Sequence, residues 1–581
     1  MRTPLPAHLL TENSLSLVMR RRTFLKGMAG VAGAAVLGAC SSAQEGGGGV
    51  GGTTLRVRAW TDFGYPTPFT YTAGPGYWKQ SLLFDTLTWP DSTGQQLPWL
   101  AESYQQSEDG LSYTVQLRDV QWSDGRPLTA RDVAFTYEYY TEPGDFYTGK
   151  RQIFTPLLIG VPRRGADVVP QGDRTVEFRL PRPDATFLQY VLGTMPIVPE
   201  HVWSTNDNPM AARDPRFLVG TGAYSLESRE VAQDVEVYAA NDRYFLGRPF
   251  VRRIDMVGAE DPLTALRAGE LDGAATEVEG APNELLAPFQ NNPEFAILSK
   301  QGAWGFPLFF NLSRGGALGD VRFRRACLHA LNRPEMVRRL LTGNGKEGSA
   351  GFVSPDSAYY NGDIRQYPFD PAEAGRLLDE AGYRRAGNSM RRNPDGTALR
   401  YTLRIPELVS AALAELVAAN LNEAGIDVEL QRVELVRLFG LKTAGDYDLL
   451  MTSFPGPAGT GPGGDPEFLR GVYHTPPPDG RPPMQNATGY SNPQVDRLLD
   501  EQLATVDFEA RKRLVGEIQR IVADDLPVAM LYYPTLFFIY RPRVFDQWYY
   551  TPGGFGPGID TDVYNKQAYI TGRKVGTEVR S

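Results

Sequence analysis

Alternation of apolar and polar residues predicts β-strands in the first third of the chain. Apolar side chains occupy every second position in residues 54–60, 113–118 and 175–180, which is the period of a strand with one buried face. The whole of 90–210 is rich in such short patterns. This region is therefore expected to contain more strands than helices.

Helical periodicity replaces this alternation in the second half. Pro371 suits the first turn of a helix and Gly382 suits its end, and Gly425 ends another apolar-periodic segment in the same way. Alternating helices and strands predict an α/β fold for this half. The expected helices span 370–381, 411–424 and 508–524, and the expected strands span 426–430 and 447–454.

The first 39 residues have the composition of an export signal. A basic segment, 20–26, precedes an apolar stretch, 28–39, that is shorter than the roughly 20 residues needed to cross a bilayer. Within the basic segment, RRTFLK at 21–26 resembles the twin-arginine export motif.

A lipid anchor is expected directly after this signal. Residues 37–40, LGAC, resemble the bacterial lipobox, in which Cys40 becomes the lipidated first residue of the mature protein. The glycine-rich sequence that follows behaves as coil, so 40–53 is expected to be a flexible tether. The alternative is an ordinary secretory signal with an incidental cysteine.

Charge and cysteine content narrow the class of protein. Removal of 1–39 takes away five basic residues and one acidic residue, which changes the net charge from −9 to −13 and argues against a nucleic-acid partner. The roughly 530 residues after the tether predict two or three domains. Cys327 is the only other cysteine and lies in a helical pattern, so it is expected to be a buried apolar side chain without a disulfide partner.

The sequence lacks the common catalytic motifs. Its four histidines are scattered without an HExxH pair, so no zinc site and no cofactor are expected. It contains neither a GxSxG elbow nor a Walker phosphate loop. The protein is therefore not expected to be an enzyme, although two of its carboxylates could meet in a cleft as in an exported glycoside hydrolase.

Four segments together carry a family resemblance. They are 122–133 (WSDGRPLTARDV), 220–224 (GTGAY), 310–333, and 489–499 followed by 511–527. In the first, Asp124-Gly125 predicts a turn, and Thr129 predicts a helix cap with Asp132 three residues later. In this order the segments resemble the extracytoplasmic solute-binding proteins of ABC importers, in the dipeptide, oligopeptide and nickel group called family 5.

The resemblance implies a two-lobed α/β fold of the periplasmic-binding-protein-like, class II type, with an extra strand-rich subdomain on the first lobe. Crossings near residues 305 and 525 would form a hinge about which the lobes close on a solute. The implied first lobe combines 54–89, 211–305 and 526–581 including a C-terminal tail, the subdomain spans 90–210, and the second lobe spans 306–525.

The resemblance also implies where a solute would bind. The loop after the first strand resembles the family's ligand loop on the first lobe, and the second lobe would contribute the long loop 454–468. Aromatic side chains there could stack on sugar rings or peptide side chains, with core packing as the alternative for each. The expected ligand contacts are Trp60, Asp62, Tyr65, Trp304, Phe306, Phe454 and Asp465.

One departure from the family pattern affects the ligand. Peptide-binding relatives carry an aspartate four residues before the proline of an Asp-Pro pair in this loop, where it pairs with the peptide's amino terminus. Here Asp465-Pro466 is present, but the matching position is Pro462. A buried ammonium needs a carboxylate partner, so Asp465 or Asp62 would have to replace the missing anchor, unless they serve only as a helix cap and a turn residue.

The resemblance therefore implies a membrane-tethered, extracytoplasmic solute-binding component that performs no bond chemistry. Peptide is the first expected ligand and oligosaccharide the main alternative. A nickel chelate is a further alternative, since bare nickel would need imidazole or thiolate ligands and His474 is the one imidazole near the loop. The expected partners are ABC permease and ATPase subunits and, through Cys40, the membrane; nothing indicates an oligomer.

Overall fold

The computed structural model describes residues 53–59, 64–70, 76–141, 167–277, 279–301, 304–387, 389–406, 409–455, 465–475, 486–552, 554 and 563–573. These fall within one unit, Gly52–Ser581. None of the helices in these ranges combines the length and the apolar character of a bilayer span. The predicted export signal, Cys40 and the loop residues Trp60 and Asp62 lie outside the described residues and stay predictions.

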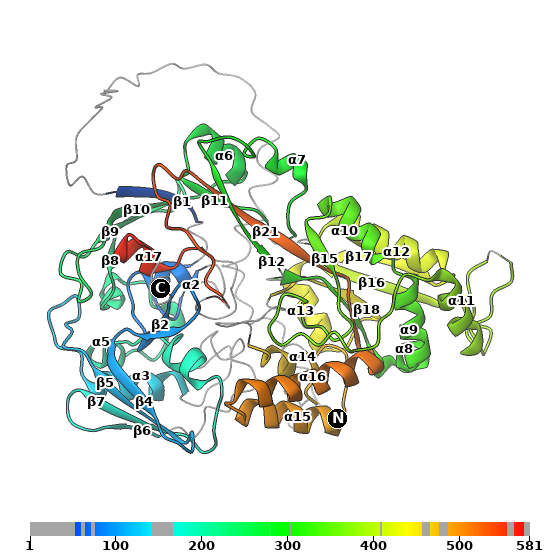
Figure 1. The fold of residues 1–581 in the computed structure, drawn as a ribbon, viewed down its shortest axis with the longest axis horizontal. Helices are drawn as coiled ribbons and strands as arrows, with labels where there is room; N and C mark the ends of the chain where they lie inside the picture. The colour runs from blue at the N-terminus through cyan, green and yellow to red at the C-terminus, as the bar shows by residue number, and fades with distance from the viewer. Residues whose placement is uncertain are drawn as a thin grey trace. The chain divides into compact units, whose positions relative to one another are not determined.

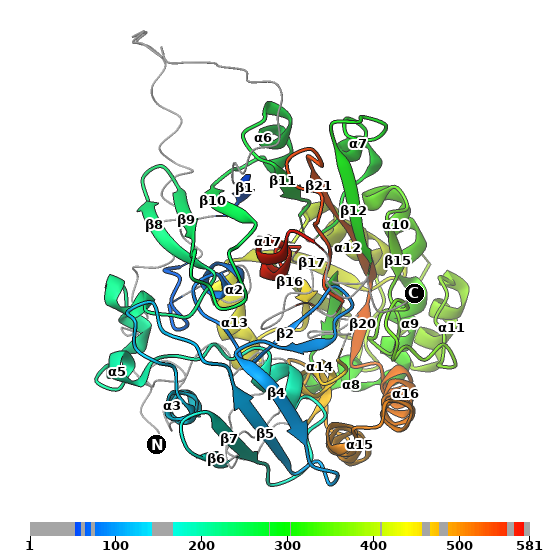
Figure 2. The same cartoon turned by 60° about the vertical axis from the view of Figure 1, so that its left-hand side comes forward.

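A mixed, eight-stranded sheet is the centre of the first lobe (Figures 1 and 2). Its order is β12-β21-β11-β1-β10-β9-β8, and β15 pairs with β21 outside this path. In β1, buried Leu55 and Val57 alternate with more exposed residues, as the sequence pattern predicts. The bounds are β1 Thr53–Arg58, β8 Tyr224–Glu230, β9 Val235–Ala240, β10 Val251–Val257, β11 Gly273–Ala275, β12 Ala296–Gln301, β15 Gly345–Glu347 and β21 Tyr532–Tyr540.

The second lobe has a five-stranded sheet of order β17-β16-β18-β14-β20. Its strands are β14 Pro307–Phe310, β16 Arg400–Pro406, β17 Asp427–Val433, β18 Leu449–Met451 and β20 Val528–Met530. The helices of this part are α8 Gly316–Gly319, α9 Val321–Ala330, α10 Arg333–Leu341, α11 Pro371–Glu380, α12 Ala411–Glu423, α13 Leu435–Thr443, α14 Phe468–Tyr473, α15 Pro493–Ala504 and α16 Phe508–Asp525. Together the two sheets and their helices confirm the expected two-lobed α/β fold.

A four-stranded antiparallel sheet, β4-β5-β7-β6, forms the subdomain. Its strands are β4 Ala101–Gln106, β5 Ser112–Leu117, β6 Asp167–Pro170 and β7 Thr175–Arg179, and a separate pair joins β2 Thr88–Pro90 to β3 Gln96–Pro98. The remaining helices are α2 Tyr77–Ser81, α3 Ala130–Thr141, α5 Glu200–Trp203, α6 Pro262–Ala268, α7 Asn283–Leu286 and α17 Lys566–Thr571.

The turn and the helix start predicted for 122–133 are confirmed. Gly125 adopts φ +88°, and its N–H donates to the carbonyl of Trp122 at 2.8 Å. The carboxylate of Asp132 accepts hydrogen bonds from both the backbone N–H and the hydroxyl of Thr129, at 2.9 and 3.0 Å. These two bonds from Thr129 to Asp132 fix the start of α3.

One predicted strand divides in two. The pattern at 447–454 predicts a single strand, but the structure has β18 and then a separate β19, Phe454–Pro455. The two have different partners: β18 pairs with β14 and β16, whereas β19 pairs with β13, Trp304–Gly305. A change of partner, which periodicity does not encode, therefore interrupts the strand.

The two chain crossings between the sheets lie side by side. The chain leaves the first sheet after β12 and enters the second at β14, and it returns between β20 and β21. At the junction, the Phe306 N–H donates to the Tyr532 carbonyl at 3.1 Å, and the Leu531 N–H donates to the Phe306 carbonyl at 2.9 Å. The crossings thus form one hydrogen-bonded pair of segments.

A buried ion pair attaches the late helix α17 to the early part of the chain. The Lys566 ammonium lies 2.5 Å from an Asp85 carboxylate oxygen, and neither side chain has exposed surface. Asp85 also accepts hydrogen bonds from Trp99, Thr221 and Tyr244 at 2.8–3.1 Å. Figures 1 and 2 both place α17 beside α2, and Lys566 donates to the Ser81 carbonyl of that helix at 3.0 Å.

Candidate functional site

Two of the predicted contact residues meet where the chain crosses between the sheets. Strands β13 and β19 pair antiparallel, with Trp304 opposite Pro455 and Gly305 opposite Phe454. This short ribbon joins the first crossing to the start of the long loop of the second lobe. The chain separation between its strands is large, so only the fold brings them together.

Trp304 offers a hydrogen-bond donor at this ribbon. Its side chain is half-buried, and its indole nitrogen is buried without a hydrogen-bond partner among the described residues. A buried donor without an acceptor is costly and uncommon. The indole N–H is therefore a candidate to bind an acceptor on a solute.

The structure places Phe306 and Phe454 in the core. Phe306 has no exposed surface and stacks on Tyr532, with ring centroids 4.9 Å apart. Phe454 is 5% exposed and meets Phe352 edge to face at 4.9 Å. In this conformation both rings are covered by protein side chains, and a solute contact for either stays a prediction.

Tyr65 lies at the described end of the first-lobe loop. The backbone there is fixed by a hydrogen bond from Thr67 N–H to the Tyr65 carbonyl at 2.8 Å. The guanidinium of Arg229 lies 5.9 Å from the centre of the partly buried Tyr65 ring. Burial raises the pKa of the Tyr65 hydroxyl, so it stays neutral and able to donate a hydrogen bond at physiological pH.

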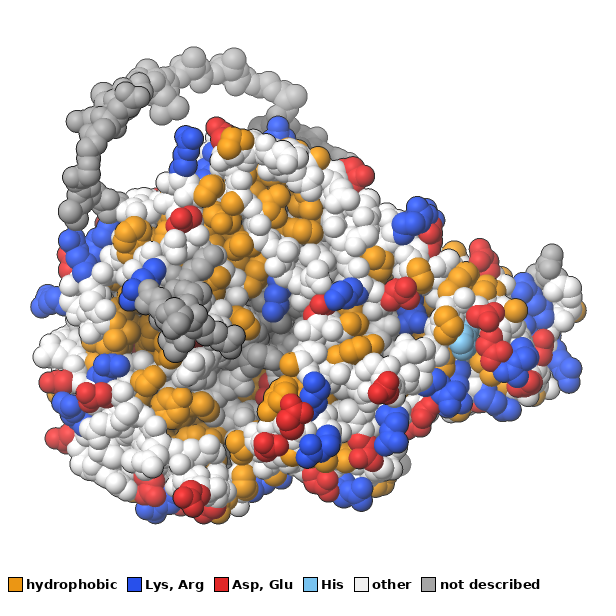
Figure 3. All heavy atoms as spheres, viewed as in Figure 1, with side chains coloured by type: hydrophobic (Ala, Val, Ile, Leu, Met, Phe, Trp, Pro, Cys, Tyr) orange, Lys and Arg blue, Asp and Glu red, His pale blue; other side chains and the backbone are white. Residues whose placement is uncertain are grey.

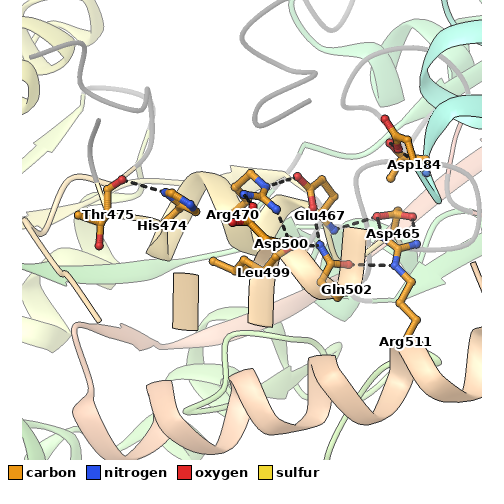
Figure 4. Close-up of polar contacts among 11 residues, drawn as sticks. Asp184, Asp465, Glu467, Arg470, His474, Thr475, Leu499, Asp500, Gln502 and Arg511 are labelled. Atoms are coloured by element: carbon orange, nitrogen blue, oxygen red, sulfur yellow. Dashed lines mark hydrogen bonds and ion pairs between the residues drawn. The ribbon is translucent and has the colours of Figure 1, made fainter. Parts of the chain in front are cut away.

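Asp465 is a buried acidic candidate, and it already has a cationic partner (Figure 4). Its two carboxylate oxygens accept hydrogen bonds from the two terminal nitrogens of Arg511 at 2.6 and 2.8 Å. The side chains are 4% and 5% exposed. Asp465 also accepts the Glu467 N–H at 2.8 Å, a turn contact just before α14, whose N-cap residue is Glu467. Its predicted solute contact stays a prediction, but its charge is offset by Arg511.

The network continues from Arg511 through Gln502 to a second guanidinium. Arg511 donates to the amide oxygen of Gln502 at 2.9 Å, and the Gln502 amide nitrogen donates to Glu467. Arg470 bonds Glu467 at 2.5 Å and Asp500 at 2.8 Å. In Figure 4 these side chains link the segment 465–470 to helices α15 and α16.

The charges of this network leave one carboxylate in excess. Among the described residues, Asp465, Glu467 and Asp500 form their ion pairs with Arg470 and Arg511. Burial raises the pKa of Glu467 to about 7, and the nearby Asp465 adds to the rise while Arg470 opposes it. The network can therefore hold one proton near neutral pH.

The described part of the chain offers few side chains that could bind a metal ion. His474 bonds the Thr475 carbonyl through Nδ1 at 2.8 Å, and no group of three histidine, cysteine or acidic side chains is arranged there for a metal ion. Cys327 is 1% exposed within the second-lobe core, and burial raises its pKa well above the usual range. This confirms the prediction that Cys327 is a buried apolar side chain.

Sequence reasoning missed Arg511 as the partner of Asp465. The two residues are 46 positions apart, on a loop and on α16, and no local pattern links them. An unpaired arginine on the apolar face of a predicted helix was the available signal, because a guanidinium on such a face requires a buried acceptor.

The sequence is similar to a family of bacterial proteins and to several individual proteins. Residues 95–476 match the family described as bacterial extracellular solute-binding proteins, family 5 Middle. Protein XP55 of Streptomyces lividans is 32% identical over 469 residues, covering 79% of this chain and 80% of that protein. The dipeptide-binding protein of Escherichia coli K12 is 25% identical over 506 residues, covering 82% and 88%.

Solved structures share the fold. NikA from Brucella suis, in complex with Fe(III)-EDTA, superposes with a TM-score of 0.72 at 24% identity and covers 86% of this chain and 98% of that one. The oligopeptide-binding protein AppA from Bacillus subtilis, in complex with a nonapeptide, gives a TM-score of 0.69 at 22% identity, with coverage of 88% and 98%.

Proposed function

Because this chain belongs to the bacterial extracellular solute-binding proteins of family 5, we propose that it is the solute-binding component of an ABC importer and that its solute is a peptide. The protein captures the peptide between its two lobes and delivers it to a permease driven by ATPase subunits. No chemical step is required, since a solute that contacts both lobes stabilises the closed state by its differential affinity.

The paired crossings at Phe306 and Leu531–Tyr532 are the observation that carries this proposal. They are hydrogen-bonded to each other where the chain passes between the two sheets, which is the arrangement expected of a hinge made of a few residues. Trp304 lies two residues from this connection. A solute bound at the β13–β19 ribbon would therefore contact the segment about which the lobes close.

Peptide is favoured because more of the compared relatives are named for dipeptide, tripeptide or oligopeptide binding than for nickel or heme binding. The unpartnered indole N–H of Trp304 suits a peptide carbonyl. Since Arg511 already offsets the charge of Asp465, we assign the peptide's amino terminus to Asp62 instead. The remaining predicted contacts at Trp60 and Tyr65 belong to the same loop.

The proposal includes anchoring at the outer face of the cell membrane. Cys40 would carry the lipid and 40–53 would act as the tether, after export through a twin-arginine signal. A Cys40→Ala variant would then appear in the soluble extracytoplasmic fraction, whereas the wild-type protein would stay with the membrane. Equal membrane association of both forms would contradict lipidation at Cys40.

A thermal-shift panel on the full chain, freed of solute, tests the ligand class. Peptides of two to five residues should raise the melting temperature, by about 2.7 kcal/mol of stabilisation at 100 times their dissociation constant. Amino-terminal acetylation and the Asp62→Asn substitution should each abolish the effect, while Asp395→Asn, at an exposed turn, should leave it intact. Stabilisation by oligosaccharides or nickel chelates alone would overturn the peptide proposal.

A further inference from the structure

A pocket lies in the second lobe. Its volume is about 800 Å³, and its walls come from α10, β15 and the segment 355–366. The charged residues that line it are Arg333, Arg338, Lys346 and Glu347. None of the predicted solute contacts is among its lining residues.

Two of the four charges are offset by carboxylates beside the pocket. Arg338 forms an ion pair with Glu335 at 2.5 Å. Lys346 forms an ion pair with Asp356. Glu335 and Asp356 do not line the pocket, but they leave Arg338 and Lys346 with little uncompensated charge.

Arg333 is a buried cation without an anionic partner in the described part of the chain. Its side chain is 5% exposed. One terminal nitrogen donates to the Gly348 carbonyl at 2.5 Å and the other to the Tyr367 carbonyl, while Nε is buried without a partner. Burial lowers the pKa of Arg333, which shows that its charge is held at a cost. The comparably buried Arg511, by contrast, is paired with a carboxylate.

Glu347 is the complementary charge on the same pocket. It is an exposed residue of β15, and the structure gives it no ion pair within the described residues. Its field acts on Arg333 and favours the charged guanidinium. The pocket is therefore lined by one buried positive charge, Arg333, and one exposed negative charge, Glu347. Neither forms an ion pair within the described residues.

We propose that this pocket binds a small zwitterion of the α-amino-acid and dipeptide class, with its carboxylate toward Arg333 and its ammonium toward Glu347. A molecule with both charges compensates the two unpaired groups at once, whereas a simple anion or cation leaves one of them unmatched. The pocket is large enough for such a molecule, and the neutralised Arg338 and Lys346 do not oppose either end.

The position of this pocket links it to the hinge. Its wall β15 pairs with residues Tyr532–Pro534 of β21, so that Glu347 lies opposite Tyr532 at the second crossing. The same region reaches the first lobe, because the Asn283 N–H donates to the Thr342 hydroxyl at 2.8 Å. Figures 1 and 2 show α10, β15 and β21 as neighbours. The inference goes beyond the proposed function, since it concerns a separate site on the same protein.

Isothermal titration of the full chain with leucine, leucyl-leucine, leucinamide and N-acetylleucine tests the proposal. Leucine or leucyl-leucine should bind, and leucinamide and N-acetylleucine, which each lack one charge, should bind at least tenfold more weakly. Failure of both zwitterions to bind at millimolar concentration would overturn the proposal. The more tightly bound of leucine and leucyl-leucine indicates which distance between carboxylate and ammonium fits Arg333 and Glu347 better.

Substitutions separate this pocket from the main solute site. Glu347→Gln should weaken the zwitterion about tenfold and leave N-acetylleucine unchanged. The matched control is Glu429→Gln, which removes an exposed carboxylate from strand β17 and should change neither. Stabilisation by the longer peptides of the main site should persist in Glu347→Gln. Equal zwitterion binding by wild type and Glu347→Gln would overturn the proposal even if peptide binding at the main site is confirmed.

Discussion

Several buried charges in the described part of this molecule form ion pairs, and this makes single residues informative. Asp85 forms an ion pair with Lys566 and accepts hydrogen bonds from three neutral donors. Neither Asp85 nor Lys566 has exposed side-chain surface. Such a pair adds little net stability over an apolar pair, but loss of one member leaves the other charge without compensation.

Lys566→Met should therefore destabilise the protein by about 3–5 kcal/mol, because Asp85 would remain buried without its cation. Urea unfolding gives the free energy. The double variant Lys566→Met/Asp85→Asn should recover part of the loss, since it removes the stranded charge as well. A loss below about 1 kcal/mol in the single variant would contradict the assigned role.

Glu467 should make stability depend on pH. Its folded pKa of about 7 lies above the ordinary value of 4.5, so between these values the folded state binds more protons than the unfolded state. The free energy of unfolding should then decrease as pH rises from about 4.5 to about 7. Urea unfolding across this range should show the decrease in wild type and a smaller one in Glu467→Gln. Identical slopes would contradict the excess-carboxylate account.

The residues of the candidate site show the limit of prediction from sequence. Trp304 is placed correctly at the crossing, because its position relative to β12 and β14 is local. Phe306 and Asp465 are partners of Tyr532 and Arg511, which lie far away in sequence. Core packing and ion pairing of this kind follow from tertiary contacts, which one sequence does not reveal.

Helices and strands can be predicted from the sequence more completely than tertiary contacts, because their sequence signals are local. Asp370 caps α11 by accepting the N–H groups of Ala372 and Glu373, and Pro371 opens the helix as predicted. Gly425 follows α12 with φ +87°, the left-handed conformation that suits a helix end. The division of 447–454 into β18 and β19 was missed, because it depends on the partners of each strand.

The GTGAY motif at 220–224 contains glycine because its backbone packs closely against the backbone of Leu82 and Leu83. Gly222 donates its N–H to the Leu83 carbonyl at 2.9 Å. A Cβ on Gly222 would lie 2.2 Å from the Leu82 carbonyl oxygen. Any side chain there would push the segment away from the end of α2.

Gly222→Ala should accordingly lower the free energy of unfolding by about 1–3 kcal/mol, as overpacking does. Gly440→Ala is the matched control: this helical glycine of α13 has open space where a Cβ would be, so alanine should stabilise by about 0.5–1 kcal/mol. Thermal or urea denaturation measures both. Equal effects of the two substitutions would contradict the close-approach argument.

The two lobes touch at points other than the hinge. The Ser410 N–H at the start of α12 donates to the Glu279 carboxylate at 2.5 Å, and the Ala185 N–H of the subdomain segment donates to the Leu503 carbonyl at 2.8 Å. These specific hydrogen bonds join the lobes in this conformation. On the face shown in Figure 3, acidic and basic side chains are interspersed.

Glu279→Ala should weaken solute binding by favouring separation of the lobes. Loss of about 1 kcal/mol of interlobe bonding corresponds to roughly a fivefold lower affinity. Titration with a stabilising peptide and small-angle scattering of the solute-free protein measure the two effects. Glu279→Gln retains an acceptor oxygen and should lie closer to wild type. An Ala variant with unchanged affinity and unchanged radius of gyration would show that this contact does not govern closure.

The first lobe is assembled from both ends of the chain, and this has a consequence for biosynthesis. Strand β1 and Asp85 leave the ribosome early, whereas β21 and α17 are made more than 470 residues after β1. At about 5–20 residues per second, roughly 25–100 s separate them. The second sheet, by contrast, draws on the continuous stretch 307–530. The stretch that forms the second sheet is therefore synthesised before β21 and α17, and a ribosome that stalls before residue 532 leaves β12 and β11 without the strand between them, for chaperones and proteases to recognise.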